Sequence, residues 1–177
     1  PPTRVLRTSA IVEDAAAASG LYLYDHRIWS KTPAWKNNAW TGTSLRAVDE
    51  WEHLLFLHRP GPFVYDRDRL DDDEWAEWGS RGIWKIPSVG RNDDAAPRFP
   101  DELAARVVRM LTEPGDLVLD PFVGTGTTTA VAHRLERRWI GIDSNPGNAE
   151  AALDRTLMQG RANAANAPAE DAGRVIH

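Results

Sequence analysis

The sequence of 177 residues contains no cysteine. This absence excludes disulfide scaffolds, thiolate zinc sites and mechanisms with a cysteine nucleophile within the chain. A cytoplasmic location is the default expectation. Long apolar runs are also missing. The longest, such as 54–57 and 117–119, fall far short of the roughly 20 residues that span a bilayer. With no recognisable leader segment, the sequence predicts a protein that is not a membrane protein.

Positive charge is scarce as well. The chain has 21 Lys and Arg against 26 Asp and Glu, a formal net charge of −5. Residues 66–77 account for the whole excess of negative charge, and we expect them to form a solvated surface loop. A protein that binds nucleic acid usually shows a basic stripe, so strong autonomous binding to DNA is not expected.

Tryptophan, in contrast, is abundant. The chain has eight tryptophans, and seven of them lie between Trp29 and Trp84. Core packing is the expected role of most of them. Where they alternate with basic residues, as in 29–36, stacking on unpaired bases is the alternative.

The first half of the chain predicts one helix and two strands. The helix covers 9–19 and ends at Gly20, and the strands cover 21–29 and 52–59 and could pair antiparallel. Residues 66–98 show no convincing element beyond a short strand at 83–86, which is typical of a functional or binding loop. Candidate inward side chains of the first strand are Leu21, Leu23 and Ile28.

From Phe99 onward the pattern becomes regular. Pro100 suits the first position of a helix that ends at Pro114. A buried parallel strand, a glycine turn, a helix and a second buried strand follow, at 116–120, 122–126, 127–137 and 139–143. These elements form a complete βαβ unit. One more helix is expected at about 148–158, before a tail too poor in large apolar side chains to pack.

The glycine turn carries the informative motif, Asp-Pro-Phe-Val-Gly-Thr-Gly-Thr-Thr-Thr at 120–129. Gly124 and Gly126 allow a sharp turn and a close approach to a ligand, and the next helix offers free N–H groups. Asp143 follows Gly124 by 143 − 124 = 19 residues, the spacing at which a carboxylate meets the hydroxyls of a ribose. The alternative is a plain tight turn, with Asp143 capping the next helix.

The ligand of this turn can be narrowed by exclusion. A phosphate-binding P-loop needs a lysine, and residues 86–177 contain none. The third glycine of a dinucleotide motif would fall at Thr129. A carboxylate at Asp120 would repel a pyrophosphate but attract an ammonium group. A ligand with a ribose, an ammonium group and no phosphate is S-adenosylmethionine.

The run FPDELAARVVRMLTEPGDLVLDPFVGTGTTTAVAHRLERRWIGID at 99–143 closely resembles the C-terminal half of the DNA amino-methyltransferases. These enzymes methylate N4 of cytosine or N6 of adenine, and the resemblance is to their permuted order: catalytic half, target-recognition region, cofactor half. It is specific over about 83–158. It implies a Rossmann-like α/β methyltransferase fold, three-layered with a partial and partly parallel sheet and an irregular target-recognition insertion. The regions implied are 1–20, a partial start; 21–98, strands and recognition region; 99–160, the cofactor half; and 161–177, a flexible tail.

The resemblance also implies site residues. The segment that lines the methionine end of the cofactor pocket corresponds to Phe99, Pro100 and Leu103. The principal cofactor loop corresponds to Asp120, Phe122, Gly124, Gly126 and Thr127, with Asp120 near the amino group and Asp143 as the ribose ligand. A looser resemblance over 20–65 implies that double-stranded DNA is contacted between 29 and 98. The candidates for contact with phosphates are Lys31, Lys36, Arg46, Arg81 and Lys85.

One feature of this family is absent from the sequence. The catalytic tetrapeptide [DNS]-P-P-[YFW] does not occur, so no catalytic residue is assigned. We expect the chain to be the cofactor and recognition half of such an enzyme, with the other half on a partner chain or outside this fragment. The alternatives are a non-catalytic S-adenosylmethionine-binding or DNA-docking subunit, and a nicotinamide-dependent Rossmann enzyme.

Overall fold

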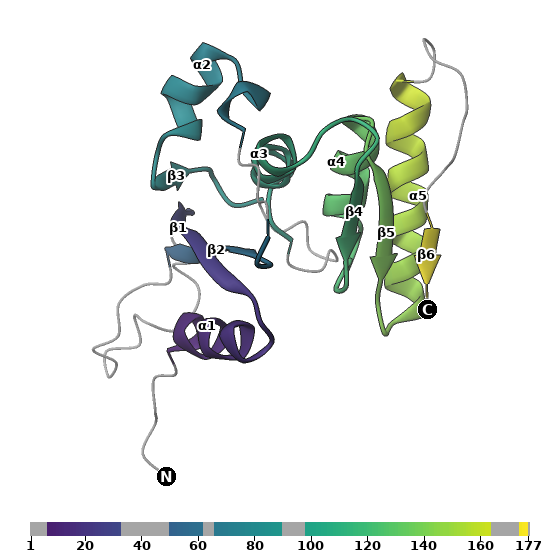
Figure 1. Ribbon diagram of the computed structural model, residues 1–177. Coiled ribbons are helices and arrows are strands. Elements are labelled where there is room, and N and C mark those ends of the chain that lie inside the picture. The colour runs from purple at the N-terminus through teal and green to yellow at the C-terminus, as the bar shows by residue number, and fades with distance from the viewer. Residues whose placement is uncertain (1–6, 33–49, 62–65, 90–97, 164–173, 177) are drawn as a thin grey trace, which may run out of the picture. The chain divides into compact units, whose positions relative to one another are not determined.

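The computed structural model describes residues 7–32, 50–61, 66–89, 98–163 and 174–176 (Figure 1). The chain divides into two compact units. The first comprises Pro1–Tyr65 and Ala76–Pro87, and the second comprises Asp66–Trp75 and Ser88–His177. Among the described residues, no helix is both long and apolar enough to cross a membrane.

The first unit is a helix with a three-stranded sheet. The helix α1 (Thr8–Ala18) ends before Gly20, whose φ of +76° confirms the predicted left-handed cap. Strands β1 (Tyr22–Ser30) and β2 (Trp51–His58) pair antiparallel, as predicted. The third strand, β3 (Ile83–Lys85), runs parallel to β1, so the strand order is β2-β1-β3.

The inward face of β1 differs from the prediction. Leu23 is exposed, and the buried side chains of the strand are Arg27 and Trp29. The reason is a bulge: Leu23 pairs with Leu57 but Asp25 pairs with Phe56, so one extra residue enters β1 at this point. A bulge reverses the alternation, and positions before it exchange faces with positions after it.

The core of the first unit is built from aromatic rings around Arg27. Its guanidinium lies 5.5 Å from the centroid of Phe56 and 5.3 Å from that of Trp84, and it donates a 2.7 Å hydrogen bond to the carbonyl of Gly79. The indole N–H of Trp29 donates to the carbonyl of Ile86. Core packing is therefore the role of Trp29, Trp78 and Trp84.

The acidic run is more regular than predicted. It forms the 3-10 turn η1 (Arg67–Arg69), the short helix α2 (Asp72–Glu74) and the π-helical turn η2 (Trp75–Gly79). Asp71 caps α2: its carboxylate accepts from the backbone N–H of Glu74, while the Glu74 carboxylate accepts from the N–H of Asp71. Asp66, which caps η1, Asp71 and Glu74 thus act in caps, a use that net charge alone did not reveal.

The second unit contains the predicted βαβ arrangement. Its elements are α3 (Asp101–Leu111), β4 (Leu117–Asp120), α4 (Thr127–Arg134), β5 (Arg138–Ile142), α5 (Pro146–Asn163) and β6 (Arg174–Ile176). All pairs in the sheet β4-β5-β6 are parallel. Several details differ from the prediction: α4 ends at Arg134 instead of 137, and α5 is longer at both ends than 148–158. Pro100 caps α3 instead of opening it, and the expected tail includes β6, because backbone pairing with β5 requires no large apolar core.

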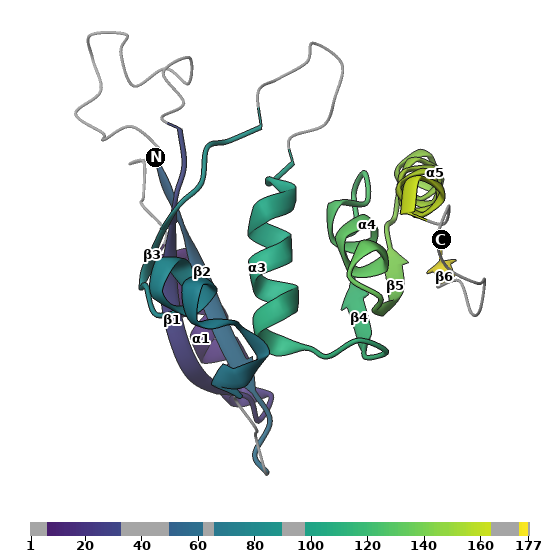
Figure 2. The same ribbon diagram turned by 90° about the horizontal axis from the view of Figure 1, so that it is seen from above.

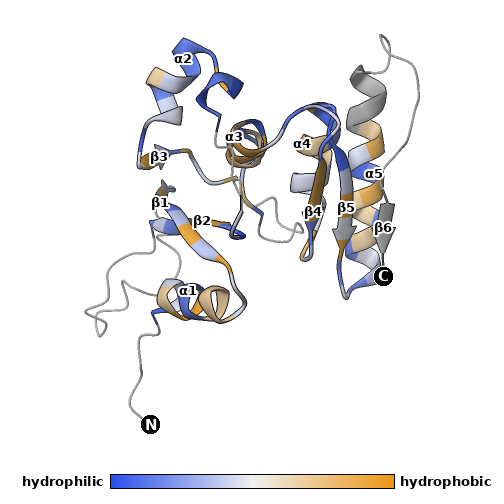
Figure 3. Cartoon of the chain, in the orientation of Figure 1, coloured by the Kyte–Doolittle hydropathy of each residue, from blue (hydrophilic) through white to orange (hydrophobic). Residues whose placement is uncertain are grey.

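Helices cover one face of this sheet. Ala130, Val131 and Ala132 of α4 are fully buried, and α3 packs on α4 through Ala104 and Val108 (Figure 2). The other face is open within the unit's described elements: Leu117 and Leu119 of β4 are 50% and 56% exposed. Figure 3, which is coloured by hydropathy, shows that β4 is mostly apolar. The expectation of a buried strand was therefore wrong for β4, since no described element of this unit covers the face with Leu117 and Leu119.

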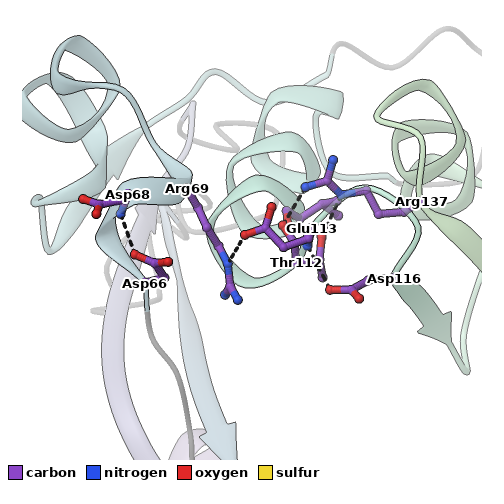
Figure 4. A network of polar contacts seen from close by, with 8 residues as sticks. Asp66, Asp68, Arg69, Thr112, Glu113, Asp116 and Arg137 are labelled. Atoms are coloured by element: carbon purple, nitrogen blue, oxygen red, sulfur yellow. Dashed lines mark hydrogen bonds and ion pairs between the residues drawn. The ribbon is translucent and has the colours of Figure 1, made fainter.

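A polar network holds the amino-terminal end of β4 (Figure 4). Arg137 donates to the hydroxyl and the carbonyl of Thr112, at 2.9 and 2.5 Å, and burial lowers the pKa of its guanidinium. The backbone N–H of Glu113 donates to Asp116, and the Glu113 carboxylate accepts from Arg69. This network fixes the carboxyl end of α3, the end that lies away from the glycine turn.

Candidate functional site

The glycine turn after β4 needs both of its glycines. Gly124 and Gly126 have φ of +51° and +82°, a region that other residues rarely adopt. A Cβ on Gly126 would lie 2.6 Å from the Cα of Ala152 on α5. The turn therefore passes against α5, and α4 begins directly after it at Thr127.

A third glycine, Gly141 of β5, lies beneath the turn. A Cβ at this position would come within 2.8 Å of a methyl group of Val123. The backbone N–H of Val123 donates to the carbonyl of Ile142 at 2.9 Å. The turn is thus seated directly on the end of β5.

Asp143 follows the end of β5 and binds this turn. Its Oδ2 accepts from the backbone N–H of Gly124 at 3.0 Å, and its Oδ1 accepts from the N–H of Asn145 and the side-chain amide of Asn148. The bond from Asn145, supported by those from Asn148 and Gly124, lowers the pKa of Asp143 against some desolvation. A carboxylate has about four acceptor positions, so this ionised group can still accept from a ligand.

Asp120 ends the neighbouring strand. β4 and β5 are parallel, and Asp120 is in register with Gly141, so both carboxylates stand at the same edge of the sheet. One oxygen of Asp120 accepts from the backbone N–H of Phe122 at 3.0 Å. Two carboxylates at one edge suit a cationic ligand with hydroxyl groups better than a phosphate. Among the described residues, no cluster of three or more potential metal ligands occurs.

The other predicted cofactor residues differ in how accessible they are. Phe122 is 87% exposed at the tip of the turn, and Phe99 is also exposed. Pro100, Leu103 and Thr127 are buried, so Leu103 would act through the packing of α3. The structure brings Gly124, Gly126, Thr127 and Asp143 together around one turn.

The sequence analysis missed three polar residues of this region. Asn145 and Asn148 hold Asp143, and the Asn-Pro pair after Ser144 was a turn signal that could have identified the first of them. Arg155 on α5 hydrogen-bonds to Thr127. No local pattern announces it, because its partners are distant in sequence.

Three of the five candidates for contact with phosphates lie among the described residues. Lys31 forms a 2.6 Å ion pair with Glu52 and lies over the ring of Trp29. Arg81 and Lys85 are exposed. Lys36 and Arg46 lie outside the described residues.

Comparison with known proteins places this geometry in context. A family of DNA methylases, designated N6/N4, matches residues 6–154. The chain is 49% identical over 144 residues to the type II methyltransferase M.BglI of Bacillus subtilis, which covers 81% of the chain and 41% of that protein. It is 29% identical over 143 residues to M.Cfr9I of Citrobacter freundii, covering 80% and 46%. The chain thus spans less than half the length of these relatives.

Solved structures show the same likeness. A DNA modification methylase from Thermus thermophilus, crystallised with S-adenosyl-L-methionine, superimposes with a TM-score of 0.69 and 30% identity, over 88% of this chain and 61% of that one. The cytosine-N4-specific PvuII DNA methyltransferase gives a TM-score of 0.69 at 24% identity, over 88% and 58%. These likenesses confirm the α/β fold that the sequence predicted.

Proposed function

This chain belongs to the N6/N4 DNA methylase family, and from that premise we propose that it is the cofactor-binding and target-recognition half of a site-specific DNA methyltransferase. The complete enzyme would methylate the exocyclic amine of cytosine (N4) or adenine (N6), in the cytoplasm. The proposal covers both amines, because the tetrapeptide that would help to distinguish them does not occur in the chain.

The bond between Asp143 and the glycine turn carries the proposal. It places an ionised carboxylate beside a turn that a ligand can approach closely. This arrangement suits S-adenosylmethionine, which has a ribose and a cationic amino-acid end. Asp143 would accept from the ribose hydroxyls, and Asp120 would face the ammonium group. Phe99 and Phe122, both exposed, are available to cover the ligand.

The division of labour follows from these groups. S-adenosylmethionine supplies a methyl group activated by its sulfonium. The residues of this chain bind and orient the donor, and none of them offers the tetrapeptide that would hold the target amine. Zero cysteine agrees with methylation at nitrogen, since methylation at C5 of cytosine requires a thiolate.

The open sheet supports a second component. β4 is an edge strand of the described sheet, and its Leu117 and Leu119 are half exposed. An apolar strand with a free edge is a template for further pairing. We infer that the segment carrying the tetrapeptide, from a partner chain or from outside these residues, continues the sheet here.

Double-stranded DNA would be met through residues between 29 and 98. A target base has to leave the duplex before its amine can be methylated. Arg81 and Lys85 are exposed and can meet phosphates, whereas Lys31 is already paired with Glu52. The net charge of −5 indicates that this contact alone is weak.

Calorimetry with the purified chain tests the proposal. S-adenosylhomocysteine should bind and NADH should not, because Asp120 would repel a pyrophosphate. Binding of NADH alone would establish the nicotinamide alternative, and binding of neither would refute the assignment of the turn. A non-catalytic subunit would bind S-adenosylhomocysteine but would never support methyl transfer with a chain that carries the tetrapeptide.

A further inference from the structure

One arginine of α5 links the starts of two other helices. The guanidinium of Arg155 donates to Oδ1 of Asp101 at 2.5 Å through Nη2 and to the hydroxyl of Thr127 at 3.0 Å through Nη1. Asp101 is the first residue of α3, and Thr127 is the first residue of α4. The guanidinium of one side chain on α5 therefore connects α5 to the first residues of α3 and α4.

The position of these partners connects the fork to the candidate cofactor site. Asp101 follows directly on Phe99 and Pro100, and Thr127 follows directly on Gly126. If the distance between Asp101 and Thr127 changes, the distance between the glycine turn and the segment before α3, Phe99 and Pro100, therefore changes too. Arg155 lies one residue beyond the region that matches the family.

Other contacts fix the opposite end of α3. Arg137 holds Thr112, and Arg109 pairs with Glu74 of α2. At the amino-terminal end, the second cation near Asp101 is Arg134, at 3.7 Å. The Arg155 side chain is only 17% exposed, so its two bonds are less screened by water than those of a surface pair.

We propose that Arg155 is a positioning residue for cofactor binding, which it supports by holding the start of α3 against the glycine turn. This inference rests on the proposed function. Arg155 donates to no candidate cofactor residue other than Thr127 in the described structure, so it acts through the placement of Phe99 and Pro100. Two hydrogen bonds from one planar guanidinium restrict the relative position of α3 and α4 more than a single point charge would.

The first test measures the affinity of the chain for S-adenosylhomocysteine by calorimetry. Arg155→Gln should weaken binding about tenfold, as expected for the loss of charge-assisted bonds. Arg155→Lys should give an intermediate affinity. Its single ammonium nitrogen cannot occupy the positions of both Nη1 and Nη2, which bind Thr127 and Asp101 separately.

Two further variants separate positioning from stability. Arg109→Gln removes an ion pair from the far end of the same helix and should leave affinity unchanged, although it also lowers the melting temperature. Asp101→Asn should weaken binding, and adding Arg155→Gln to it should have little further effect. Unchanged affinity in Arg155→Gln, or equal loss in Arg109→Gln, would overturn the proposal.

The second test requires no ligand. Because the chain has no cysteine, spin labels can be attached at Arg98→Cys and Ser144→Cys, which are exposed positions before α3 and after Asp143. The distance distribution should broaden in Arg155→Gln and remain narrow in Arg109→Gln. An unchanged distribution refutes the inference whether or not the chain binds S-adenosylhomocysteine, whereas a wild-type chain that binds no cofactor refutes only the proposed function.

Discussion

The carboxylate of Asp143 accepts a hydrogen bond from the backbone N–H of Gly124, with 3.0 Å between Oδ2 and the nitrogen. This bond closes the crossover from β4 to β5 at the edge where ligands bind in parallel sheets. The turn and the acid therefore form one hydrogen-bonded unit. Asp143 shapes the turn, and under the proposed function it would also offer its remaining acceptor positions to a ribose.

Replacing Asp143 tests both roles. Asp143→Asn keeps the size of the side chain but removes the charge and one acceptor, and Asp143→Ala removes the whole group. Affinity for S-adenosylhomocysteine should fall by about tenfold or more in both variants. Asp154→Asn, an exposed acidic position on α5, is the matched control and should bind normally. Unchanged affinity in both Asp143 variants would leave it with the capping role alone.

The lowered pKa of Asp143 predicts a pH effect on stability. Its ordinary value is 3.8, and the hydrogen bond from Asn145 is the main cause of the decrease. A carboxyl group with a depressed pKa stabilises the folded state above its unfolded pKa, and it loses this contribution as the pH falls through the folded value. The difference in unfolding free energy between wild type and Asp143→Asn should be constant above about pH 5 and shrink below 3.8. Urea titrations across this range measure it, and a difference that grows on acidification would contradict the assignment.

Local sequence signals were enough to predict the βαβ unit that carries the glycine turn and Asp143. The short apolar runs, the paired glycines and the spacing to Asp143 predicted the βαβ unit, and the structure differs from it at element ends and in the exposure of β4. Sequence patterns did not predict the features that depend on contacts between residues far apart in the sequence. The bulge in β1 depends on its pairing with β2, and the fork of Arg155 joins residues 28 and 54 positions away.

The close approach of the glycine turn to α5 predicts a large effect of one methyl group. Gly126→Ala would add backbone strain at a φ of +82° and place its Cβ 2.6 Å from the Cα of Ala152. We expect a loss of about 2 to 4 kcal/mol in unfolding free energy, from left-handed strain together with overpacking.

Gly115 provides the control for strain alone. Its φ is +87°, but a Cβ there would meet nothing within 4 Å. Gly115→Ala should therefore lose only about 1 kcal/mol. Urea unfolding compares the two variants, and equal losses would show that crowding at α5 contributes nothing.

DNA contact by the region between 29 and 98 predicts weak, salt-sensitive binding. Removing the five candidate charges together should reduce affinity for duplex DNA and make it less dependent on salt, since each neutralised phosphate adds about 0.9 to the slope of log K against log salt. Fluorescence anisotropy at several salt concentrations measures this slope. If the affinity and the slope are unchanged in this variant, DNA binds elsewhere on the chain. The variant replaces Lys31, Lys36, Arg46, Arg81 and Lys85 with glutamine.

The final prediction concerns methyl transfer. The purified chain should incorporate no radiolabelled methyl group into DNA of mixed sequence, because its sequence lacks the tetrapeptide. Holding the target amine in line with the methyl donor is a positioning effect worth about 7 to 11 kcal/mol at its largest. A chain that carries the tetrapeptide should restore incorporation at N4 of cytosine or N6 of adenine. Leu119→Glu should prevent this restoration, because it places a charge on the open apolar face of β4, the edge strand from which we propose that the sheet continues. The variant should still bind S-adenosylhomocysteine. Met158→Glu, at another exposed apolar position on α5, should complement normally. Incorporation by the chain alone would show that its active site is complete, and normal complementation by Leu119→Glu would show that the second component joins elsewhere.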